Sequence, residues 1–185
     1  MSVNTDIFQD PSYIVLNIPS PVADQLRSIR SFFDPPRANM AIEISLCGSN
    51  GCGTILSGQD TDMVFAELDA VAAKAEAFSA KFGHVEHFPD TGIFYYTLED
   101  SEPFEKLHSM ITESNIKFND TKFAYEPHCT LKLAKHAEYT EEQILERLQP
   151  PNQDFIIDTM SVYSLSQNQQ IPRLLHRVNF GETKD

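Results

Sequence analysis

The stretch PHCTLKLA (residues 127–134) has the alternating pattern of a β-strand, and the fold predicted for this chain depends on it. Side chains alternate between the two faces of a β-strand, so His128, Thr130 and Lys132 project to one side. The residues between them project to the other side and suit a hydrophobic core. The stretch therefore predicts a strand with one apolar face and one face on which an ionisable group stands beside a hydroxyl.

A second stretch, AIEISLC (residues 41–47), has the same arrangement, with Glu43 and Ser45 on one face. An imidazole gives or takes a proton near neutral pH, and a hydroxyl donates a hydrogen bond to a phosphate oxygen. If the two strands face each other, we expect an acid and a base on opposite sides of one phosphorus atom. A solvated amphipathic strand shows the same alternation without any site, and this alternative stays open.

The chain around the two stretches repeats a strand–helix–strand order. The predicted elements are a strand at 13–18, a helix at 21–33 and a strand at 41–47, then a strand at 92–98, a helix at 101–114 and a strand at 127–134. Ser20 is the predicted N-cap of the first helix, with Pro21 in the first helical position. We expect an α+β fold with a bilobal pseudo-twofold duplication. Two mainly antiparallel sheets would face a central cleft, with the helices outside.

Further elements are expected between and after these units. They are a long helix at about 61–82, a strand at 84–88, a short helix that begins after Thr140, and two closing strands at about 154–165 and 172–180. Thr140 and Gln143 have the spacing of a capping box. The predicted domain organisation is a lead-in at 1–12, a single bilobal domain at 13–180 and a tail at 181–185.

The charge balance separates the classes of ligand. The chain has 27 acidic and 14 basic residues and a net charge of −13 at pH 7. A surface this negative repels polyanions, so binding of duplex DNA is not expected. A small nucleotide or the phosphoester of an RNA end remains a suitable partner, because a local basic pocket can outweigh distant charges.

The remaining composition bears on compartment and cofactors. The chain has three cysteines and no Cys-x-x-Cys pair, so a disulfide framework is not expected. The polar N-terminus lacks a secretory signal, and no apolar run is long enough to cross a bilayer. We therefore expect a cytoplasmic monomer that does not associate with membranes. His84 and His87 would face opposite sides of a strand and no HExxH motif occurs, so neither a metal nor another cofactor is predicted.

Taken together, the sequence resembles the two-histidine (2H) phosphoesterase superfamily, which includes 2′-5′ RNA ligases and cyclic nucleotide phosphodiesterases. PHCTLKLA, the opening YIVLNIPSPVADQLRSIR (residues 13–30) and the ending SVYSLSQNQQIPRLLHRVNFG (residues 161–181) carry the resemblance. It implies a bilobal fold in which each lobe supplies one His-x-Thr/Ser strand to a shared cleft. It also implies that the paired histidines act as general acid and base without a metal. Substrates of the family include 2′,3′-cyclic, 1″,2″-cyclic and 2′-5′ phosphodiesters.

The second motif of the family matches His128 and Thr130. In the first motif Glu43 stands where the family has histidine, while Ser45 fits the hydroxyl position. Three outcomes follow. In the first, Glu43 acts as the base and protonated His128 as the acid, with Lys132 offsetting the negative charge. In the second, the site binds a nucleotide or phosphate without turnover. In the third, the substrate is no longer a phosphodiester. We favour a metal-independent phosphodiesterase or 2′-5′ RNA ligase-like enzyme that acts on RNA ends or small nucleotides. A non-catalytic nucleotide-binding relative is the alternative.

Overall fold

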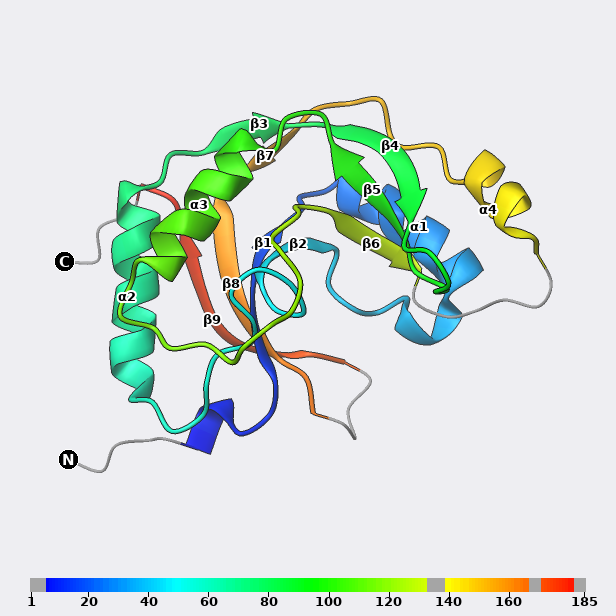
Figure 1. The fold of residues 1–185 in the computed structure, drawn as a ribbon. Helices are drawn as coiled ribbons and strands as arrows, with labels where there is room; N and C mark the ends of the chain where they lie inside the picture. The colour runs from blue at the N-terminus through cyan, green and yellow to red at the C-terminus, as the bar shows by residue number, and fades with distance from the viewer. Residues whose placement is uncertain (1–5, 133–138, 167–170, 182–185) are drawn as a thin grey trace.

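The structure, a computed structural model, describes residues 6–132, 139–166 and 171–181 (Figure 1). The helices are α1 (Val22–Phe33), α2 (Thr61–Lys74), α3 (Glu102–Thr112) and α4 (Glu141–Arg147), with short 3-10 turns at Asp6–Phe8 and Pro35–Arg37. The strands are β1 (Ser12–Asn17), β2 (Glu43–Cys47), β3 (Phe78–Ala80), β4 (Phe82–His87), β5 (Phe94–Leu98), β6 (Cys129–Lys132), β7 (Phe155–Ile157), β8 (Thr159–Ser164) and β9 (Arg173–Asn179).

Antiparallel sheets form two lobes. The first lobe contains a four-stranded sheet in the order β2-β1-β8-β9, and the second contains a three-stranded sheet in the order β4-β5-β6. A short sheet of β3 and β7 joins them at the top of Figure 1. Because β1-α1-β2 and β5-α3-β6 each end in an antiparallel pair of strands, the predicted α+β fold with repeated strand–helix–strand units is confirmed.

The two units exchange their helices. α1 follows β1 in the chain but contacts β6 of the other lobe, and α3 follows β5 but contacts β2 and α2. The buried apolar residues of both lobes form a single cluster. Neither lobe therefore has a separate core, and the strands β2 and β6 are held side by side by shared packing.

The apolar undersides of β2 and β6 lie in this common core, as expected. Ile44 and Leu46 of β2 and Cys129 and Leu131 of β6 are at most 1% exposed. Burial on this scale fixes the register of a strand, because a slip by one residue would turn the polar face inward. The polar faces of both strands are thereby left to line the space between the lobes.

The prediction of a long helix at 61–82 is wrong for its second half. α2 ends at Lys74, and Phe78 and Phe82, which continue its apolar spacing, belong to β3 and β4. Phe78 pairs with Ile157 and Phe82 with Leu98. Ile157 comes from a distant part of the chain and Leu98 from the next strand, β5, and pairing with them outweighs the local helical preference.

Two smaller expectations also need correction. The N-cap of α1 is Pro21 and not Ser20, and no side chain caps this end. The closing strand expected at 154–165 divides at Asp158 into β7 and β8, which pair in different sheets. By contrast, the capping box of Thr140 and Gln143 is present at the start of α4.

The structure contains one disulfide that the sequence interpretation did not predict, because Cys47 is bonded to Cys52. The loop between them turns back so that Cys47 bridges to Gly51, and the two cysteine Cα atoms lie 5.1 Å apart. Such a distance suits a disulfide. The odd cysteine count argues against a framework of several bonds but does not exclude one local pair. The third cysteine, Cys129, is free and buried.

Within the described residues, the structure contains no helix with the length and apolar character needed to span a membrane.

Candidate functional site

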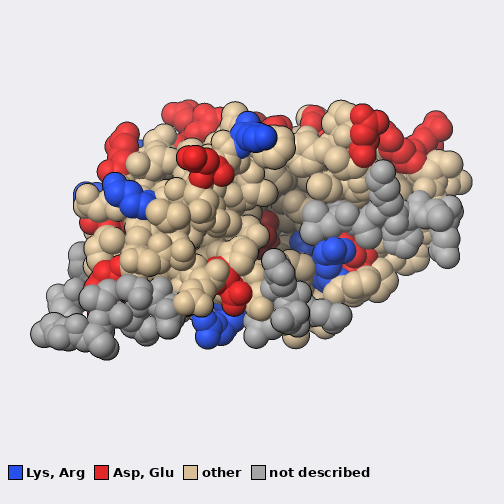
Figure 2. All heavy atoms as spheres, turned by 60° about the horizontal axis from the view of Figure 1, so that its bottom comes forward, with Lys and Arg blue, Asp and Glu red and all other residues tan. Residues whose placement is uncertain are grey.

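A cavity of about 240 Å³ lies between the two motif strands. Its walls include Glu43 and Ser45 of β2, Thr130 of β6, Tyr13 of β1 and Arg30 of α1. Figure 2 shows the surface hollowed between the lobes, with acidic and basic atoms in or beside the hollow. The cavity therefore brings together three of the five residues that the sequence singled out.

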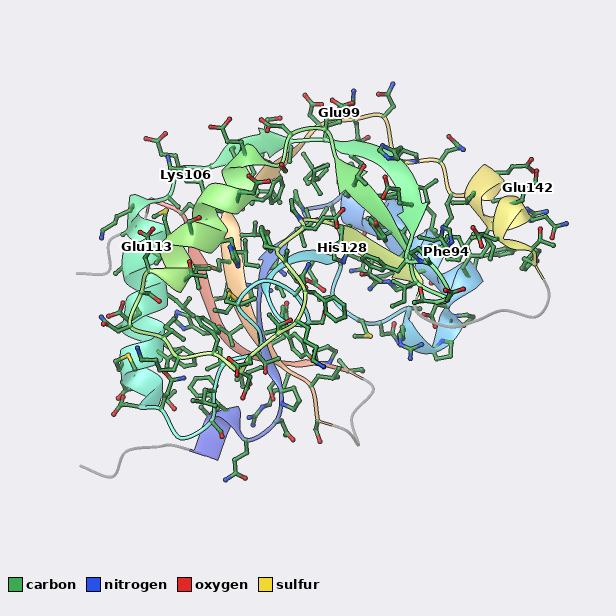
Figure 3. All side chains as sticks on the ribbon, viewed as in Figure 1. Phe94, Glu99, Lys106, Glu113, His128 and Glu142 are labelled. Atoms are coloured by element: carbon green, nitrogen blue, oxygen red, sulfur yellow. A yellow bond between two sulfur atoms is a disulfide. The ribbon has the colours of Figure 1, made fainter. Side chains whose placement is uncertain are left out.

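His128 immediately precedes β6 and is not among the residues that line this cavity. Figure 3 shows it near the centre of the molecule, at the beginning of β6. Its ring centroid is 4.9 Å from that of Tyr95 and 5.6 Å from that of Phe88. The imidazole thus packs beside two aromatic rings, two residues before Thr130 in the chain. The side chain of Lys132, the fifth predicted residue, lies outside the described part of the structure.

The two nitrogens of His128 have different surroundings. Nδ1 is 2.7 Å from the carbonyl oxygen of Glu126 and donates to it in the tautomer that carries the proton there. Nε2 of the neutral ring is then a lone-pair acceptor. Burial lowers the pKa of His128, and the Glu126 carbonyl and carboxylate oppose only part of this shift. The imidazole is therefore suited to take a proton at neutral pH.

Glu43 is shifted in the opposite direction. Burial raises the pKa of its carboxyl group to about 7, although the positive charge of Arg30 and a hydrogen bond from Ser45 both oppose the shift. The Ser45 hydroxyl donates to Oε2 of Glu43 over 3.3 Å. A carboxyl group with a pKa near 7 is partly protonated at neutral pH and can donate this proton, whereas an ordinary surface glutamate is ionised.

Arg30 connects the two motif strands and is a site residue that the sequence interpretation missed. It is 6% exposed, and its guanidinium donates to the carbonyl oxygens of Met40 (3.2 Å), Ala41 (2.9 Å) and Thr130 (2.7 Å). The first two acceptors lie just before β2, and the third lies in β6. The available signal was its place next to Ile29, a member of the apolar face predicted for the helix at 21–33.

Asn50 is a second residue whose contribution the sequence does not reveal. It is 8% exposed, and its Nδ2 donates over 3.2 Å to the same Glu126 carbonyl that accepts from His128. The loop that follows the first motif thereby braces the backbone in front of the second. Asn50-Gly51 is a local turn signal, but the partner of Asn50 is 76 residues away and was not predictable from local sequence.

Other charged groups complete the surroundings of the cavity. Arg37 also lines it and forms an ion pair of 3.1 Å with the buried carboxylate of Asp34. Within the described ranges, no cluster of three or more histidine, cysteine or acidic side chains has the arrangement of a metal site. The arrangement can therefore supply one proton donor, one proton acceptor and two hydroxyls from residues of this chain.

Comparison with known proteins agrees with this architecture. A sequence model described as the 2′-5′ RNA ligase superfamily matches residues 18–169. No curated protein sequence matches the chain.

Several solved structures are similar in fold. E. coli LigT in complex with 3′-AMP superimposes with a TM-score of 0.64 at 14% identity, covering 94% of this chain and 99% of LigT. TT0787 of Thermus thermophilus superimposes with a TM-score of 0.61 at 12% identity, covering 92% of this chain and 98% of the other. A structure described as a phosphoesterase gives 0.59 at 13% identity, with 92% and 98% covered. At such low identities these likenesses establish the fold alone. The match over most of the sequence establishes the family, and the chain belongs to the 2′-5′ RNA ligase superfamily of 2H phosphoesterases.

Proposed function

We propose that this protein is a metal-independent phosphoesterase that acts on cyclic or 2′-5′ phosphodiesters of RNA ends or small nucleotides. The observation that supports the proposal is the convergence of Glu43, Ser45 and Thr130 on one cavity, with His128 two residues before Thr130 in the chain. We further propose a cytoplasmic monomer whose partners are these small phosphoesters. LigT, which shares the fold, has been crystallised with 3′-AMP, phosphate, ATP and NADP⁺, and this supports a nucleotide as the ligand.

The pKa shifts favour an assignment of roles opposite to the one expected from the sequence. Near neutral pH the raised pKa of Glu43 favours a proton on the carboxyl group, and the lowered pKa of His128 favours a neutral imidazole. His128 Nε2 then takes a proton from the water that attacks phosphorus, and Glu43 gives its proton to the ribose oxygen whose bond to phosphorus breaks. Ser45 and Thr130 donate hydrogen bonds to the non-bridging phosphate oxygens.

This assignment also answers the electrostatic difficulty of a glutamate beside a phosphate. An anionic carboxylate would repel the phosphodiester, whereas a protonated one does not and can donate a hydrogen bond. Arg30 contributes a positive charge behind the site. Its guanidinium donates to backbone carbonyl oxygens, which do not neutralise this charge.

The test is the hydrolysis of nucleoside 2′,3′-cyclic phosphates and 2′-5′-linked dinucleotides by the wild type, His128→Ala and Glu43→Gln. We expect both substitutions to lower kcat by about 10²–10⁴-fold, the usual contribution of a general acid or base. Undiminished activity of His128→Ala would overturn the mechanism. Binding of 3′-AMP without any turnover by the wild type would instead favour the non-catalytic alternative.

A second substrate distinguishes the two roles. In a p-nitrophenyl phosphodiester the leaving group departs without help from an acid, so loss of the acid matters little and loss of the base remains severe. We expect Glu43→Gln to recover most of its activity on this substrate and His128→Ala to stay impaired. The reverse result would restore Glu43 as the base.

A further inference from the structure

The cavity at Glu43 and Ser45 has a second cavity as its neighbour. A neighbouring cavity of about 450 Å³ is lined by residues that include Asn17, Tyr163 and Arg177, and Tyr163 lines both cavities. Figure 1 shows β9, which carries Arg177, beside β8 at the edge of the four-stranded sheet.

The strand register places Arg177 on the same face of the sheet as the site. Ser45 pairs with Val15, Val15 with Ser161, and Ser161 with Arg177. Residues that pair directly across antiparallel strands have their side chains on the same face. These four residues therefore form one row that runs from the phosphate-binding hydroxyl of Ser45 to the guanidinium of Arg177.

Hydrogen bonds hold the guanidinium over β8. Arg177 Nε donates to Ser161 Oγ over 3.1 Å, and Nη2 donates to the hydroxyl of Tyr163 over 3.0 Å. The side chain thus bends back toward β1, and its charged end lies about two strand spacings, or roughly 10 Å, from β2. One nucleoside carrying a phosphate at each end has the size to connect the two positions.

The guanidinium of Arg177 has more N–H groups than hydrogen bonds. A guanidinium has five N–H groups, and Arg177 directs only two bonds, both to neutral hydroxyls. Among the described arginines, Arg27 and Arg37 have aspartate partners, whereas Arg177 has no ion pair with any described acidic side chain. Arg177 is also exposed, so its remaining donors are open to a ligand.

Tyr163 adds a further donor. Its hydroxyl oxygen accepts from both Arg177 Nη2 and Asn17 Nδ2, the latter over 3.3 Å, so its own proton remains to be donated. Asp158 also lines the second cavity, where one oxygen of its carboxylate accepts from Thr159 Oγ1. The donors at Tyr163 lie next to the first cavity, because Tyr163 lines both cavities.

We propose that Arg177 and Tyr163 form a second phosphate subsite, which binds a phosphate of the substrate one nucleoside away from the phosphodiester held by Ser45 and Thr130. This inference rests on the proposed function for the position of the first phosphate. It makes the substrate a nucleotide with at least two phosphate groups, such as a 5′-phosphorylated 2′,3′-cyclic nucleotide or an internal linkage of an oligonucleotide.

The test compares pairs of ligands that differ by one phosphate. Adenosine 2′,3′-cyclic phosphate and its 5′-phosphorylated form are compared for KM, and 3′-AMP and adenosine 3′,5′-bisphosphate are compared for Kd by calorimetry. For the wild type we expect the second phosphate to tighten both values by about tenfold, as one charge-assisted contact does. In Arg177→Gln this advantage disappears, while kcat and the values for the ligands with one phosphate are unchanged.

Arg173→Gln is the matched control, because Arg173 is an exposed arginine of the same strand that lines neither cavity. An equal loss in Arg173→Gln and Arg177→Gln, or no advantage of the second phosphate in the wild type, would overturn the subsite. If no ligand is turned over but the bisphosphate binds more tightly in an Arg177-dependent way, the proposed catalysis fails and the subsite stands.

Discussion

At the scale of single residues, Glu43 has the most consequential position. Its carboxyl group lines the cavity between the two motif strands. Burial raises its pKa to about 7, close to the ordinary value of a histidine. A glutamate in this setting can exchange a proton near neutral pH, as the proposed general acid must.

The raised pKa has a cost in stability that depends on pH. Between about pH 4.5 and 7 the carboxyl group ionises in the unfolded chain before it ionises in the folded protein, so the free energy of unfolding falls as pH rises. Above pH 7 both states are ionised and the loss stays constant, at most about 3 kcal/mol. We expect Glu43→Gln to be more stable than the wild type at pH 8, with a gain that shrinks toward pH 4.5.

Urea unfolding of both proteins at pH 5, 6, 7 and 8 measures this gain. Glu146→Gln, on the exposed surface of α4, is the control for removing one negative charge. A gain that does not change with pH, or an equal gain in Glu146→Gln, would show that the pKa of Glu43 is not raised in the folded protein.

At the scale of elements, the side chain of Arg30 in α1 connects β6 to the segment that leads into β2. A guanidinium can serve three carbonyl oxygens in different directions, whereas a lysine ammonium on a flexible stem cannot span them. We expect Arg30→Lys to lower the free energy of unfolding by about 2–4 kcal/mol, because buried carbonyl groups lose their charged donor. Activity should fall as well, since the two motif strands lose their connection.

Arg27→Lys is the matched control on the same helix. Arg27 is exposed and forms a surface ion pair with Asp24, so its replacement should change stability by no more than about 0.5 kcal/mol. Thermal unfolding and the activity assay measure both effects. Similar stability of the Arg30→Lys and Arg27→Lys proteins would contradict the role of Arg30.

The loop after β2 depends on a close approach of two backbone segments. Gly53 has a positive φ of 79°, and a Cβ atom there would lie 2.0 Å from the backbone oxygen of Asn119. Gly58 has a similar φ of 84°, but a Cβ atom there would meet no atom within 4 Å. Gly53→Ala should therefore destabilise the protein by at least about 2 kcal/mol more than Gly58→Ala, which carries the backbone strain alone. Chemical denaturation of the two variants gives the difference directly, and equal values would disprove the steric argument.

At the scale of the whole molecule, the net charge opposes the binding of long nucleic acids, whereas the cavities suit small anions. The net charge of −13 repels long polyanions, while arginines from several elements line the cavities between the lobes. We expect no measurable binding of a 20-base-pair RNA or DNA duplex up to about 10 µM protein at physiological salt, because binding of that kind requires many cationic contacts. Fluorescence anisotropy measures it. Tight, salt-sensitive binding of the duplex would contradict this interpretation of the surface.

The sequence by itself determined the features that repeat over a few residues. Alternation along 41–47 and 127–134 showed which faces of two strands are polar, and the order of strands and helices indicated two similar units in an α+β fold. Such patterns are local because they follow from the pleat of a strand and the turn of a helix, and burial of Ile44 and Leu131 agrees with them.

Only the tertiary structure decided the features that depend on partners far along the chain. Phe78 and Phe82 suit a helix locally, yet pairing with Ile157 and Leu98 places them in strands. The bond from Arg30 to Thr130 spans 100 residues, and no local pattern reports it. The pKa of Glu43 follows from the same cause, because burial between two lobes is a property of their assembly and not of the residues beside it.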